Sequence, residues 1–245
     1  MAQKPEGLVL WDGKKRVSGR GANELRPISM QVGVIPQVSG SAMVSFGKTQ
    51  AIASVYGPKP TVPSHLSKPN KAIVRVEYTM APFSTKDRIS PKFSRRSQEI
   101  SEILTRAFEA AIFTDLYPET EIDIFVQVIN ADAGTRIACL NAASLALCQA
   151  GIEMRDLVVG LTAGKVDGKV VLDLDNSEDN YGDADFAFAV MPTKNEIVAL
   201  QMDGDLSKEE FDEALKLMKN GIQKIYQMQR DALLLGYKEE SDGKN

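Results

Sequence analysis

Apolar and polar residues alternate in short runs over the first third of the chain and again in several later segments. In residues 28–34 the apolar side chains fall at every second position, and residues 122–128 repeat this spacing. A period of two residues is typical of half-buried β-strands, and turns containing glycine or proline separate the runs. The first four strands therefore suggest a largely antiparallel meander. Strands are predicted at residues 28–34, 41–46, 51–56, 72–80, 121–130, 157–163, 186–191 and 197–202, with a hairpin over 165–174 around Asp167-Gly168.

Three longer segments have the apolar period of helices. Residues 95–117 form an amphipathic segment that follows Ser94, the expected N-cap. Residues 137–150 are apolar almost all round, which is typical of a buried helix. A capping box at residues 207–210 opens a long amphipathic helix that is predicted to end near residue 235.

No composition break or linker divides the chain cleanly. We therefore interpret it as an α+β protein of two βα lobes that pack as one body. The predicted organisation is a polar, irregular segment over 1–26, a first lobe over 27–155, a second lobe over 156–237 and a charged, disordered tail over 238–245.

The composition excludes several classes of protein and site. The 245 residues are 43% hydrophobic, which allows a sizeable core, but no run approaches the ~18 apolar residues of a membrane-spanning helix. The first residues lack the apolar region of a signal peptide, so we expect a cytoplasmic protein without a membrane partner. Cys139 and Cys148 lie on one predicted helix about 13 Å apart, which is too far for a disulfide. A single histidine, His65, excludes a structural zinc site and leaves only that residue for Ser-His-Asp chemistry.

The formal net charge of −4 conceals a polarity along the chain. Residues 1–100 hold 16 Lys and Arg against 6 Asp and Glu and so carry +10, whereas residues 101–245 carry −14. A basic first part and an acidic second part suggest an oriented partner, or a site in which a polyanion lies beside metal-binding carboxylates. Charge complementarity within a ring or dimer predicts the same asymmetry.

Residues 131–136, Ala-Asp-Ala-Gly-Thr-Arg, join a predicted strand to the buried helix. The N–H groups at the start of that helix, its dipole, the Thr135 hydroxyl and the Arg136 guanidinium can converge on an anion. In the alternative interpretation, Thr135 is only an N-cap and Gly134 only eases a tight turn.

Two other places carry the charges that such a site needs. Arg95 and Arg96 fall in the first turn of a predicted helix, where a cation opposes the helix dipole by about 0.3–1 kcal/mol. A carboxylate from elsewhere in the fold or a bound phosphate would offset that cost. Asp179 and Asp185 belong to an acidic loop, which is either a solvated turn or a Mg²⁺ site completed by waters.

These features together indicate phosphoryl chemistry, because its transition state is stabilised mainly by positioning and charge. Anion donors at two helix starts would lie beside a site for a divalent cation. No activated serine or cysteine nucleophile is evident in the sequence, so water or inorganic phosphate would be the nucleophile.

A series of short motifs extends this pattern over nearly the whole chain, at residues 23–27, 40–42, 55–58, 80–84, 94–96, 122–125, 131–136, 150–152, 154–156 and 201–204. Taken in order, they resemble the RNase PH family of phosphorolytic exoribonucleases, and within it the catalytic ring subunit of the archaeal RNA exosome. The resemblance implies an RNase PH-like fold, with two lobes similar to ribosomal protein S5 domain 2.

The resemblance also implies residue roles at the anion-binding end of the site. Gly134, Thr135 and Arg136 match the phosphate-binding turn, where the family often has serine in place of Thr135. Arg95 and Arg96 match the arginine pair that grips the RNA backbone and the attacking phosphate.

The acidic residues and one loop match further family features. Asp179 matches the acid that protonates the leaving 3′ oxygen or binds Mg²⁺, and Asp185 matches its metal-binding companion, with Mn²⁺ as an alternative ion. The loop that contains Ser64, His65 and Lys68 matches the neck of a central pore through which RNA threads.

Three positions depart from the family pattern. Archaeal members usually carry Arg where Ser64 stands, so RNA grip at the pore would be weaker or would come from His65 and Lys68. The family usually has Asp where Ser18 and Ser39 stand, and neither position belongs to the expected reaction centre.

The implied reaction is attack by inorganic phosphate on the 3′-terminal phosphodiester of single-stranded RNA, which releases a nucleoside 5′-diphosphate and is reversible as RNA tailing. The implied partners are single-stranded RNA, a homologous inactive subunit that alternates with this one in a hexameric ring (a trimer of heterodimers), and S1/KH-type RNA-binding cap proteins. A non-catalytic RNA-binding ring or scaffold subunit is the alternative. A small-molecule phosphotransferase is a third interpretation, but the chain has no Walker or kinase glycine loop.

Overall fold

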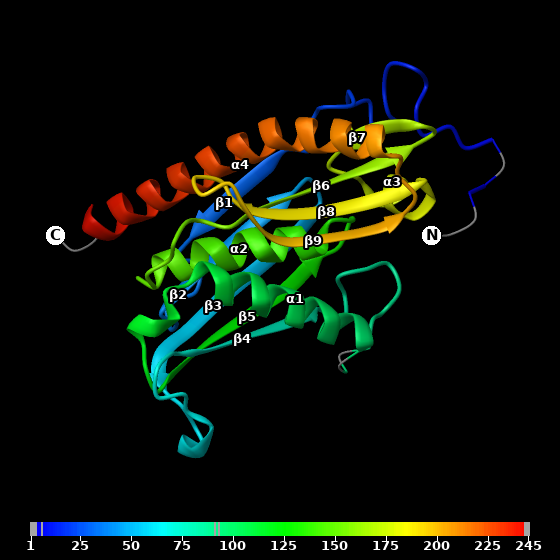
Figure 1. Ribbon diagram of the computed structural model, residues 1–245. Coiled ribbons are helices and arrows are strands. Elements are labelled where there is room, and N and C mark those ends of the chain that lie inside the picture. The colour runs from blue at the N-terminus through cyan, green and yellow to red at the C-terminus, as the bar shows by residue number, and fades with distance from the viewer. Residues whose placement is uncertain (1–3, 6, 91, 93, 243–245) are drawn as a thin grey trace.

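Two β-sheets and the helices that pack on them make up the computed structural model, which describes residues 4–5, 7–90, 92 and 94–242 (Figure 1). The strands of the first sheet are β1 (Ile28–Val32), β2 (Gly40–Phe46), β3 (Thr49–Pro60), β4 (Ile73–Met80) and β5 (Thr120–Asn130), in the order β1-β2-β3-β5-β4. Those of the second sheet are β6 (Val159–Val166), β7 (Lys169–Leu172), β8 (Ala184–Met191) and β9 (Glu196–Gly204), in the order β7-β6-β8-β9.

The first sheet follows the predicted meander only through its first three strands. β1, β2 and β3 pair antiparallel in chain order, but β5 lies between β3 and β4 and pairs with β4 in parallel. A parallel pair needs a crossover connection, which helix α1 (Arg95–Ala111) supplies. The outer edge of β4 is covered by α1, because Thr105 and Ser101 accept the N–H groups of Val76 and Tyr78 through their hydroxyl oxygens, at 3.1 and 2.9 Å.

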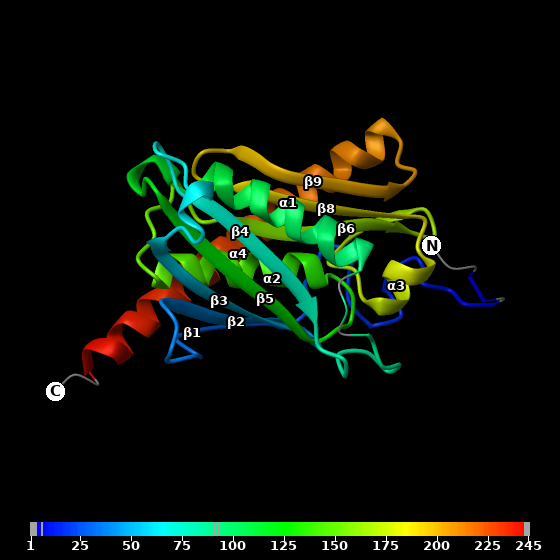
Figure 2. The ribbon, with the colours of Figure 1, turned by 90° about the horizontal axis from the view of Figure 1, so that it is seen from below.

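The elements stack in four layers (Figures 1 and 2). Helices α1 and α2 (Thr135–Gln149) lie between the two sheets. The first half of α4 (Lys208–Asp242) covers the far face of the second sheet, and its second half continues to β1 and α2. Every residue of α2 from Ile137 to Leu147 is buried, which confirms the prediction of a helix enclosed on all sides.

A buried polar contact ties α2 to the second sheet and to α4. Asn141 donates to the carbonyl oxygen of Gly160 at 2.9 Å and accepts its N–H at 3.2 Å. Gln229 of α4 donates to Asn141 at 2.9 Å and to the carbonyl oxygen of Val158 at 3.1 Å. Unpaired polar groups would be costly in this core, so these hydrogen bonds fix how the lobes pack.

Two predicted segments differ in the structure. Helix α1 ends at Ala111 rather than at 117, because Ile112 is extended and forms a β-bridge with Met154. The acidic loop contains a short helix, α3 (Asn176–Tyr181), because the Asp175 side chain caps its first turn.

The C-terminal helix is longer than the sequence predicted. α4 continues to Asp242, so residues 238–242 of the predicted disordered tail are helical. No proline interrupts this stretch, and lysine and glutamate favour helix. Residues 243–245 of the predicted tail, and Pro91 and Phe93 of the loop at 84–93, lie outside the described residues.

The N-terminal segment is irregular, as predicted, but it packs closely on the second sheet. Leu10 is fully buried in a small apolar cluster with residues of β6 and β7. Asp167, in the hairpin turn between those strands, accepts the N–H groups of Leu10 and Trp11 at 2.7 and 3.2 Å. Further along the segment, Arg16 reaches the acidic loop that follows β7, where its Nη1 lies 3.2 Å from Glu178 Oε2.

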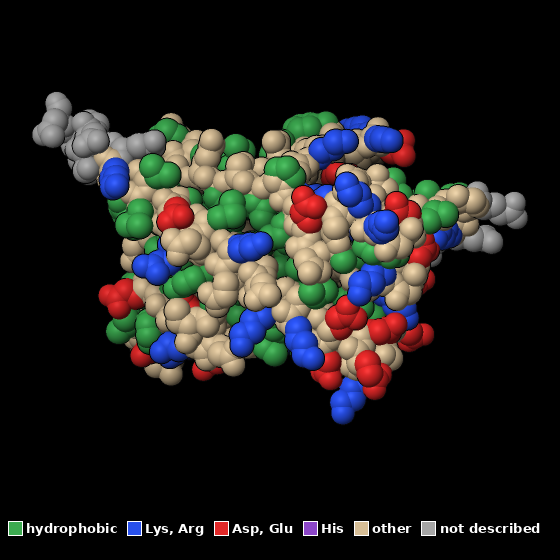
Figure 3. All heavy atoms as spheres, turned by 90° about the horizontal axis from the view of Figure 1, so that it is seen from above, with side chains coloured by type: hydrophobic (Ala, Val, Ile, Leu, Met, Phe, Trp, Pro, Cys, Tyr) green, Lys and Arg blue, Asp and Glu red, His purple; other side chains and the backbone are tan. Residues whose placement is uncertain are grey.

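The surface of the molecule mixes charged and apolar side chains on the face seen from above. On the face that Figure 3 shows, Lys and Arg side chains are scattered among hydrophobic and acidic ones and do not form one basic patch. Among the described helices, none combines the length and apolar character that crossing a bilayer requires. Cys139 and Cys148 are both free thiols.

Candidate active site

The stretch at 131–136 forms a tight turn between β5 and α2. Ala133 and Gly134 have left-handed backbones, with φ of 61° and 65°, a conformation that alanine rarely adopts. The buried Thr49 hydroxyl holds this turn, because it donates to the carbonyl oxygen of Ala133 at 2.7 Å and accepts the N–H of Asp132 at 3.0 Å. The alternative in which Thr135 is the N-cap is wrong: Gly134 is the N-cap, and no side chain of the described residues caps the first turn of α2.

Thr135 is the first residue of α2, and its hydroxyl is oriented by a tyrosine. The Tyr78 hydroxyl donates to the Thr135 hydroxyl oxygen at 3.0 Å. Burial raises the pKa of Tyr78 to about 12, so the phenol keeps its proton at neutral pH. Because the Thr135 oxygen already accepts one proton, its own proton is available to an acceptor in front of the helix.

Arg136 carries a donor without an acceptor. Its Nε is buried and has no hydrogen-bond partner among the described residues. Burial lowers the pKa of Arg136, and the charge of Arg96 acts in the same direction, whereas Asp185 opposes them. A buried N–H that lacks a partner is costly, so an anion bound here would gain a strong hydrogen bond.

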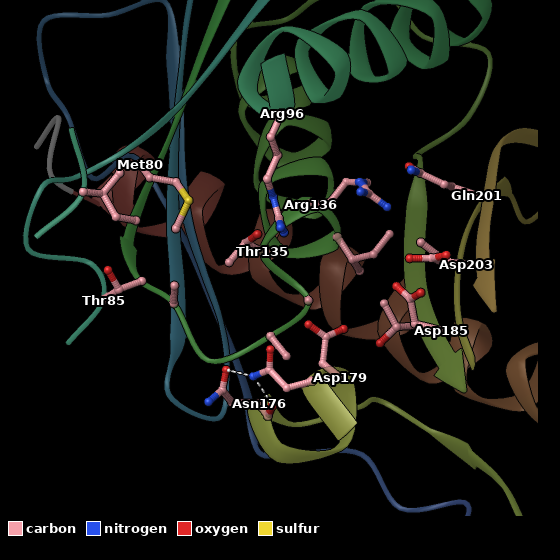
Figure 4. Close-up of a pocket in the computed structure, with 18 of the residues that line it drawn as sticks. Met80, Thr85, Arg96, Thr135, Arg136, Asn176, Asp179, Asp185, Gln201 and Asp203 are labelled. Atoms are coloured by element: carbon pink, nitrogen blue, oxygen red, sulfur yellow. Dashed lines mark hydrogen bonds between the residues drawn. The ribbon is translucent and has the colours of Figure 1, made fainter. Parts of the chain in front are cut away.

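Helix α1 brings a second arginine to this place. Ser94 is its N-cap, as predicted, and accepts the Ser97 N–H at 3.1 Å within a capping box. Arg96 extends from α1 toward Thr135 (Figure 4). The first turn of α1 contains no acidic residue, so the expected offset for the charge of its two arginines does not come from that turn.

The carboxylates come from the second lobe. Asp175 accepts the N–H groups of Ser177 and Glu178 at 3.0 and 3.1 Å and so starts α3. From α3, Asp179 points into the cavity on the side of Thr135 and Arg136 (Figure 4). Asp185 lies in β8, directly opposite Asp203 of β9.

These residues surround one cavity of about 570 Å³ between the lobes (Figure 4). The helix starts of α1 and α2 supply the cationic side, and α3, β8 and β9 supply the anionic side. The structure therefore brings together most of the predicted site, namely Arg96, Gly134, Thr135, Arg136, Asp179 and Asp185.

Burial raises the pKa of Asp179 and Asp185, two of the three aspartates that line this cavity. For Asp179, Arg96 and Arg136 act against that rise. For Asp185, the neighbouring carboxylates of Asp179 and Asp203 add to it. A carboxyl group with a raised pKa keeps its proton to a higher pH than an ordinary aspartate, which suits proton donation to a leaving group.

Asp179 and Asp185 are the residues of this cavity that could hold a divalent cation. Asp179 raises the pKa of Asp185 by repulsion, and a cation between two such carboxylates would relieve it. Mg²⁺ commonly uses one or two carboxylates and completes its octahedron with waters and substrate phosphates. Two carboxylate ligands from the protein are therefore enough for Mg²⁺. The described part of the chain has no group of three or more His, Cys, Asp or Glu able to hold a metal.

Four predicted RNA-binding residues do not reach this cavity. Ser64, His65 and Lys68 are exposed at the loop between β3 and β4, around the short 3₁₀ turn Ser64–Leu66 that projects from the sheet (Figure 1). Arg95 is exposed at the start of α1 and does not line the cavity. A role in binding RNA away from the reaction centre stays a prediction for all four.

Sequence reasoning missed the residues that support the site. Gln201 and Asp203 line the cavity, and Gln201 donates to Glu99 of α1 at 2.9 Å. Both lie in the matched motif at 201–204, which would have been the signal. Tyr78 and Thr49 carry no local signal, because each acts on a turn that is distant in the sequence.

A buried ion cluster supports α3 from the N-terminal segment. The side chains of Arg16 and Glu178 are fully buried and lie 3.2 Å apart at Nη1 and Oε2, a type of pair whose disruption costs about 3–5 kcal/mol. Arg20 adds weaker contacts to Asp175 and Glu178 at 3.5 Å. Ser18 accepts from Arg20 Nε at 3.0 Å, so serine still provides an acceptor at that departure from the family pattern.

Comparison with known proteins adds independent information. The family model described as 3′ exoribonuclease family, domain 1, matches residues 24–153, and the model for domain 2 matches residues 156–221. The exosome complex component Rrp41 of Pyrococcus abyssi is 53% identical over 234 residues, which are 95% of this chain and 94% of the relative. Rrp41 of Methanopyrus kandleri is 51% identical over 233 residues, which are 95% of this chain and 97% of the relative.

Solved structures give a matching picture of the architecture. Rice Rrp46 has a TM-score of 0.80 and 23% identity, and the match covers 89% of this chain and 100% of that chain. A chain of the Archaeoglobus fulgidus exosome with RNA bound to the active site has a TM-score of 0.75 and 23% identity, over 86% of this chain and 91% of that chain. At this identity the likeness bears on the fold alone.

Proposed function

Because this chain belongs to the 3′ exoribonuclease family and has an RNase PH-like fold, we propose that it degrades single-stranded RNA from the 3′ end with inorganic phosphate. Each turnover releases one nucleoside 5′-diphosphate, and the reverse reaction adds a nucleotide to the RNA. The observation that carries this proposal is that Arg136 and Asp179, from different lobes, line one cavity.

In the proposed mechanism, the phosphate nucleophile lies at the start of α2. The N–H groups of that turn, the Thr135 hydroxyl and the Arg136 guanidinium donate to its oxygens, and Arg96 adds a second positive charge. Fixed donors of this kind lower the barrier because they are already oriented toward the charge of the transition state. The buried Nε of Arg136 without a partner supports this assignment.

Asp179 is proposed to act on the leaving side. A phosphate oxygen forms a bond to the 3′-terminal phosphorus while the bond from that phosphorus to the preceding 3′ oxygen breaks. Asp179, whose pKa burial raises, donates a proton to this oxygen, and the shortened RNA leaves with a 3′-hydroxyl group. Asp179 regains its proton from the next hydrogen phosphate that binds.

In the alternative role of Asp179, it and Asp185 would hold Mg²⁺ or Mn²⁺ as ionised carboxylates. When bound, the ion would neutralise charge on the transferring phosphoryl group. Arg96 and Arg136 provide positive charge from the opposite side of the cavity, so the chain's own residues already balance much of the phosphate charge.

We further propose that the chain works in a cytoplasmic complex. Relatives that are about half identical are named exosome complex components, which supports membership in such an assembly. In this proposal a homologous inactive subunit alternates with this one in a hexameric ring, and S1/KH-type cap proteins deliver RNA. The exposed loop with Ser64, His65 and Lys68 would contact RNA on its way to Arg95 and Arg96.

One assay tests the proposed function. The full-length chain, together with its proposed partner subunit, is incubated with poly(A) and Mg²⁺, with and without inorganic phosphate. ADP that appears only with phosphate supports the proposal. AMP that appears without phosphate would make the protein a hydrolase, and RNA binding without any product would favour a scaffold subunit.

Tyr78→Phe is expected to raise the KM for phosphate by about 2- to 12-fold, the effect of losing one hydrogen bond of about 0.5–1.5 kcal/mol. The ring still fills the core, but the Thr135 hydroxyl is no longer held in one orientation. Phosphorolysis rates at increasing phosphate concentration measure this effect. Tyr56→Phe, at an exposed tyrosine outside the cavity, is the control and should match the wild type.

Replacing Arg95 and Arg96 together with alanine is expected to weaken RNA binding and flatten its salt dependence. If each arginine contacts one phosphate of a single strand, the slope of log K against log salt should fall by about 1.4. Fluorescence anisotropy with labelled poly(A) at several salt concentrations measures the slope. Arg106→Ala, further along the same helix, is the control, and unchanged binding by the double variant would remove the pair from the account.

A further inference from the structure

We propose that Arg26 is a positioning residue of this site: its guanidinium joins the segment that leads into α3 to the turn that binds phosphate, and so fixes the two sides of the cavity relative to each other. The inference rests on the proposed function, because it concerns where phosphate lies relative to Asp179. Arg26 does not line the cavity and acts through residues that do.

One side of Arg26 is engaged by Asp173. Its Nε lies 3.1 and 3.0 Å from the two carboxylate oxygens, its Nη2 donates to Oδ1 at 2.7 Å, and its backbone N–H donates to Oδ2 at 2.7 Å. Arg26 is 7% exposed and Asp173 is 1% exposed. A buried, forked pair of this kind has little freedom to move.

The other side of Arg26 reaches the phosphate-binding turn. Its Nη1 donates to the carbonyl oxygen of Asp132, two residues before Gly134. The guanidinium also lies against the turn, since a Cβ atom at Gly134 would be 3.1 Å from Nη2. Gly134 is the N-cap of α2, so a displacement of Arg26 would shift Thr135 and Arg136.

Asp173 carries the effect to α3. Its backbone is left-handed, with φ of 54°, and its N–H donates to the carbonyl oxygen of Thr162 at 2.8 Å. Such a conformation persists when surrounding contacts hold it, and Arg26 provides several of them. Two residues later Asp175 starts α3, which carries Asp179. Arg26 therefore sets where this helix begins relative to the phosphate turn.

Arg20 offers a matched comparison. It is 9% exposed and also meets Asp173, with Nη1 at 2.9 Å from the carbonyl oxygen and 3.5 Å from Oδ2. Among the described residues, the other hydrogen bonds and ion pairs of its side chain are to Ser18, Glu24, Asp175 and Glu178, and none of these belongs to the phosphate turn. Arg20 thus has a similar charge and burial but contacts only one side of the cavity.

The test compares Arg26→Gln, Arg26→Lys and Arg20→Gln in the full-length chain, in the same assembly as the wild type. Phosphorolysis gives kcat and the KM for phosphate, calorimetry gives the affinity for inorganic phosphate, and thermal unfolding gives stability. We expect kcat/KM for phosphate to fall by about 10- to 100-fold in both Arg26 variants, the scale of misplaced reacting groups. Lysine should fail because one ammonium group cannot form the fork and reach Asp132 as well.

Arg20→Gln should lower the unfolding temperature about as much as Arg26→Gln while phosphate affinity stays close to that of the wild type. Equal losses of phosphate affinity in the Arg20 and Arg26 variants would overturn the inference. If Arg26→Gln does not fold, the charge-preserving lysine variant decides, and wild-type kinetics in that variant would overturn it. A wild type that binds phosphate but releases no diphosphate would refute the proposed function, and the contrast in phosphate affinity would still test Arg26.

Discussion

Asp179→Asn is expected to lower kcat for phosphorolysis by about 10²- to 10⁴-fold, the range of a general acid, while RNA binding is largely retained. Asparagine has nearly the same shape and stays in the cavity, but it cannot donate a carboxylic proton to the leaving 3′ oxygen. It also removes one of the two carboxylates proposed to hold the metal. Single-turnover release of ADP from poly(A) measures the chemical step.

Asp183→Asn is the matched control for this variant. Asp183 lies in the same acidic segment, but it is exposed and does not line the cavity. Among the described residues its side chain accepts one hydrogen bond, from the N–H of Gly168 at 3.1 Å. It should retain wild-type rates. If Asp179→Asn kept a rate within threefold of the wild type, Asp179 would be neither the acid nor a required ligand.

Arg136→Gln is expected to have the second-largest effect, a loss of about 10²- to 10³-fold in kcat/KM for phosphate, as for other fixed donors to a developing charge. The buried Nε of Arg136 has no partner in the described structure, so its hydrogen bond would be made mainly to the phosphate. The loss should appear when phosphate is varied and should be small when RNA is varied.

Arg136→Lys distinguishes the effect of the positive charge from the effect of the planar guanidinium group. Lysine keeps the positive charge but lacks the planar fork, so an intermediate loss is expected. Arg106→Gln serves as the control, since Arg106 is exposed on α1 and pairs with Glu102 of the same helix. Equal phosphate dependence of Arg136→Gln and the wild type would move the anion site away from the start of α2.

Much of the site could be predicted because its signals are local. Alternating polar and apolar residues predict the strand at 121–130, and a nearly continuous apolar segment predicts the buried helix at 137–150. Gly134 between them indicates the tight turn. Ser94 directly precedes an amphipathic segment, which predicts it as the N-cap of α1. The Asp167-Gly168 dipeptide predicts a hairpin turn, and both residues have positive φ in the structure.

The remainder depends on contacts between distant residues, for which no local pattern exists. The position of β4 beside β5, rather than beside β3, follows from a crossover helix and not from the strand's own sequence. Arg26 meets Asp173 across 147 positions, and Tyr78 meets Thr135 across 57. Arg16 and Arg20 lie in a segment that was predicted only to be polar and irregular, and the sequence does not show that their buried charges pair with carboxylates of the second lobe.

The central claim, that phosphate held at the start of α2 attacks the RNA end beside Asp179, is tested most directly by isotope transfer. Poly(A) is incubated with the protein and phosphate labelled with ¹⁸O, and the released nucleotide is analysed by mass spectrometry. The account predicts ADP that carries the label in its β-phosphoryl group and in the oxygen bridging the two phosphorus atoms. Unlabelled AMP as the first product would contradict it.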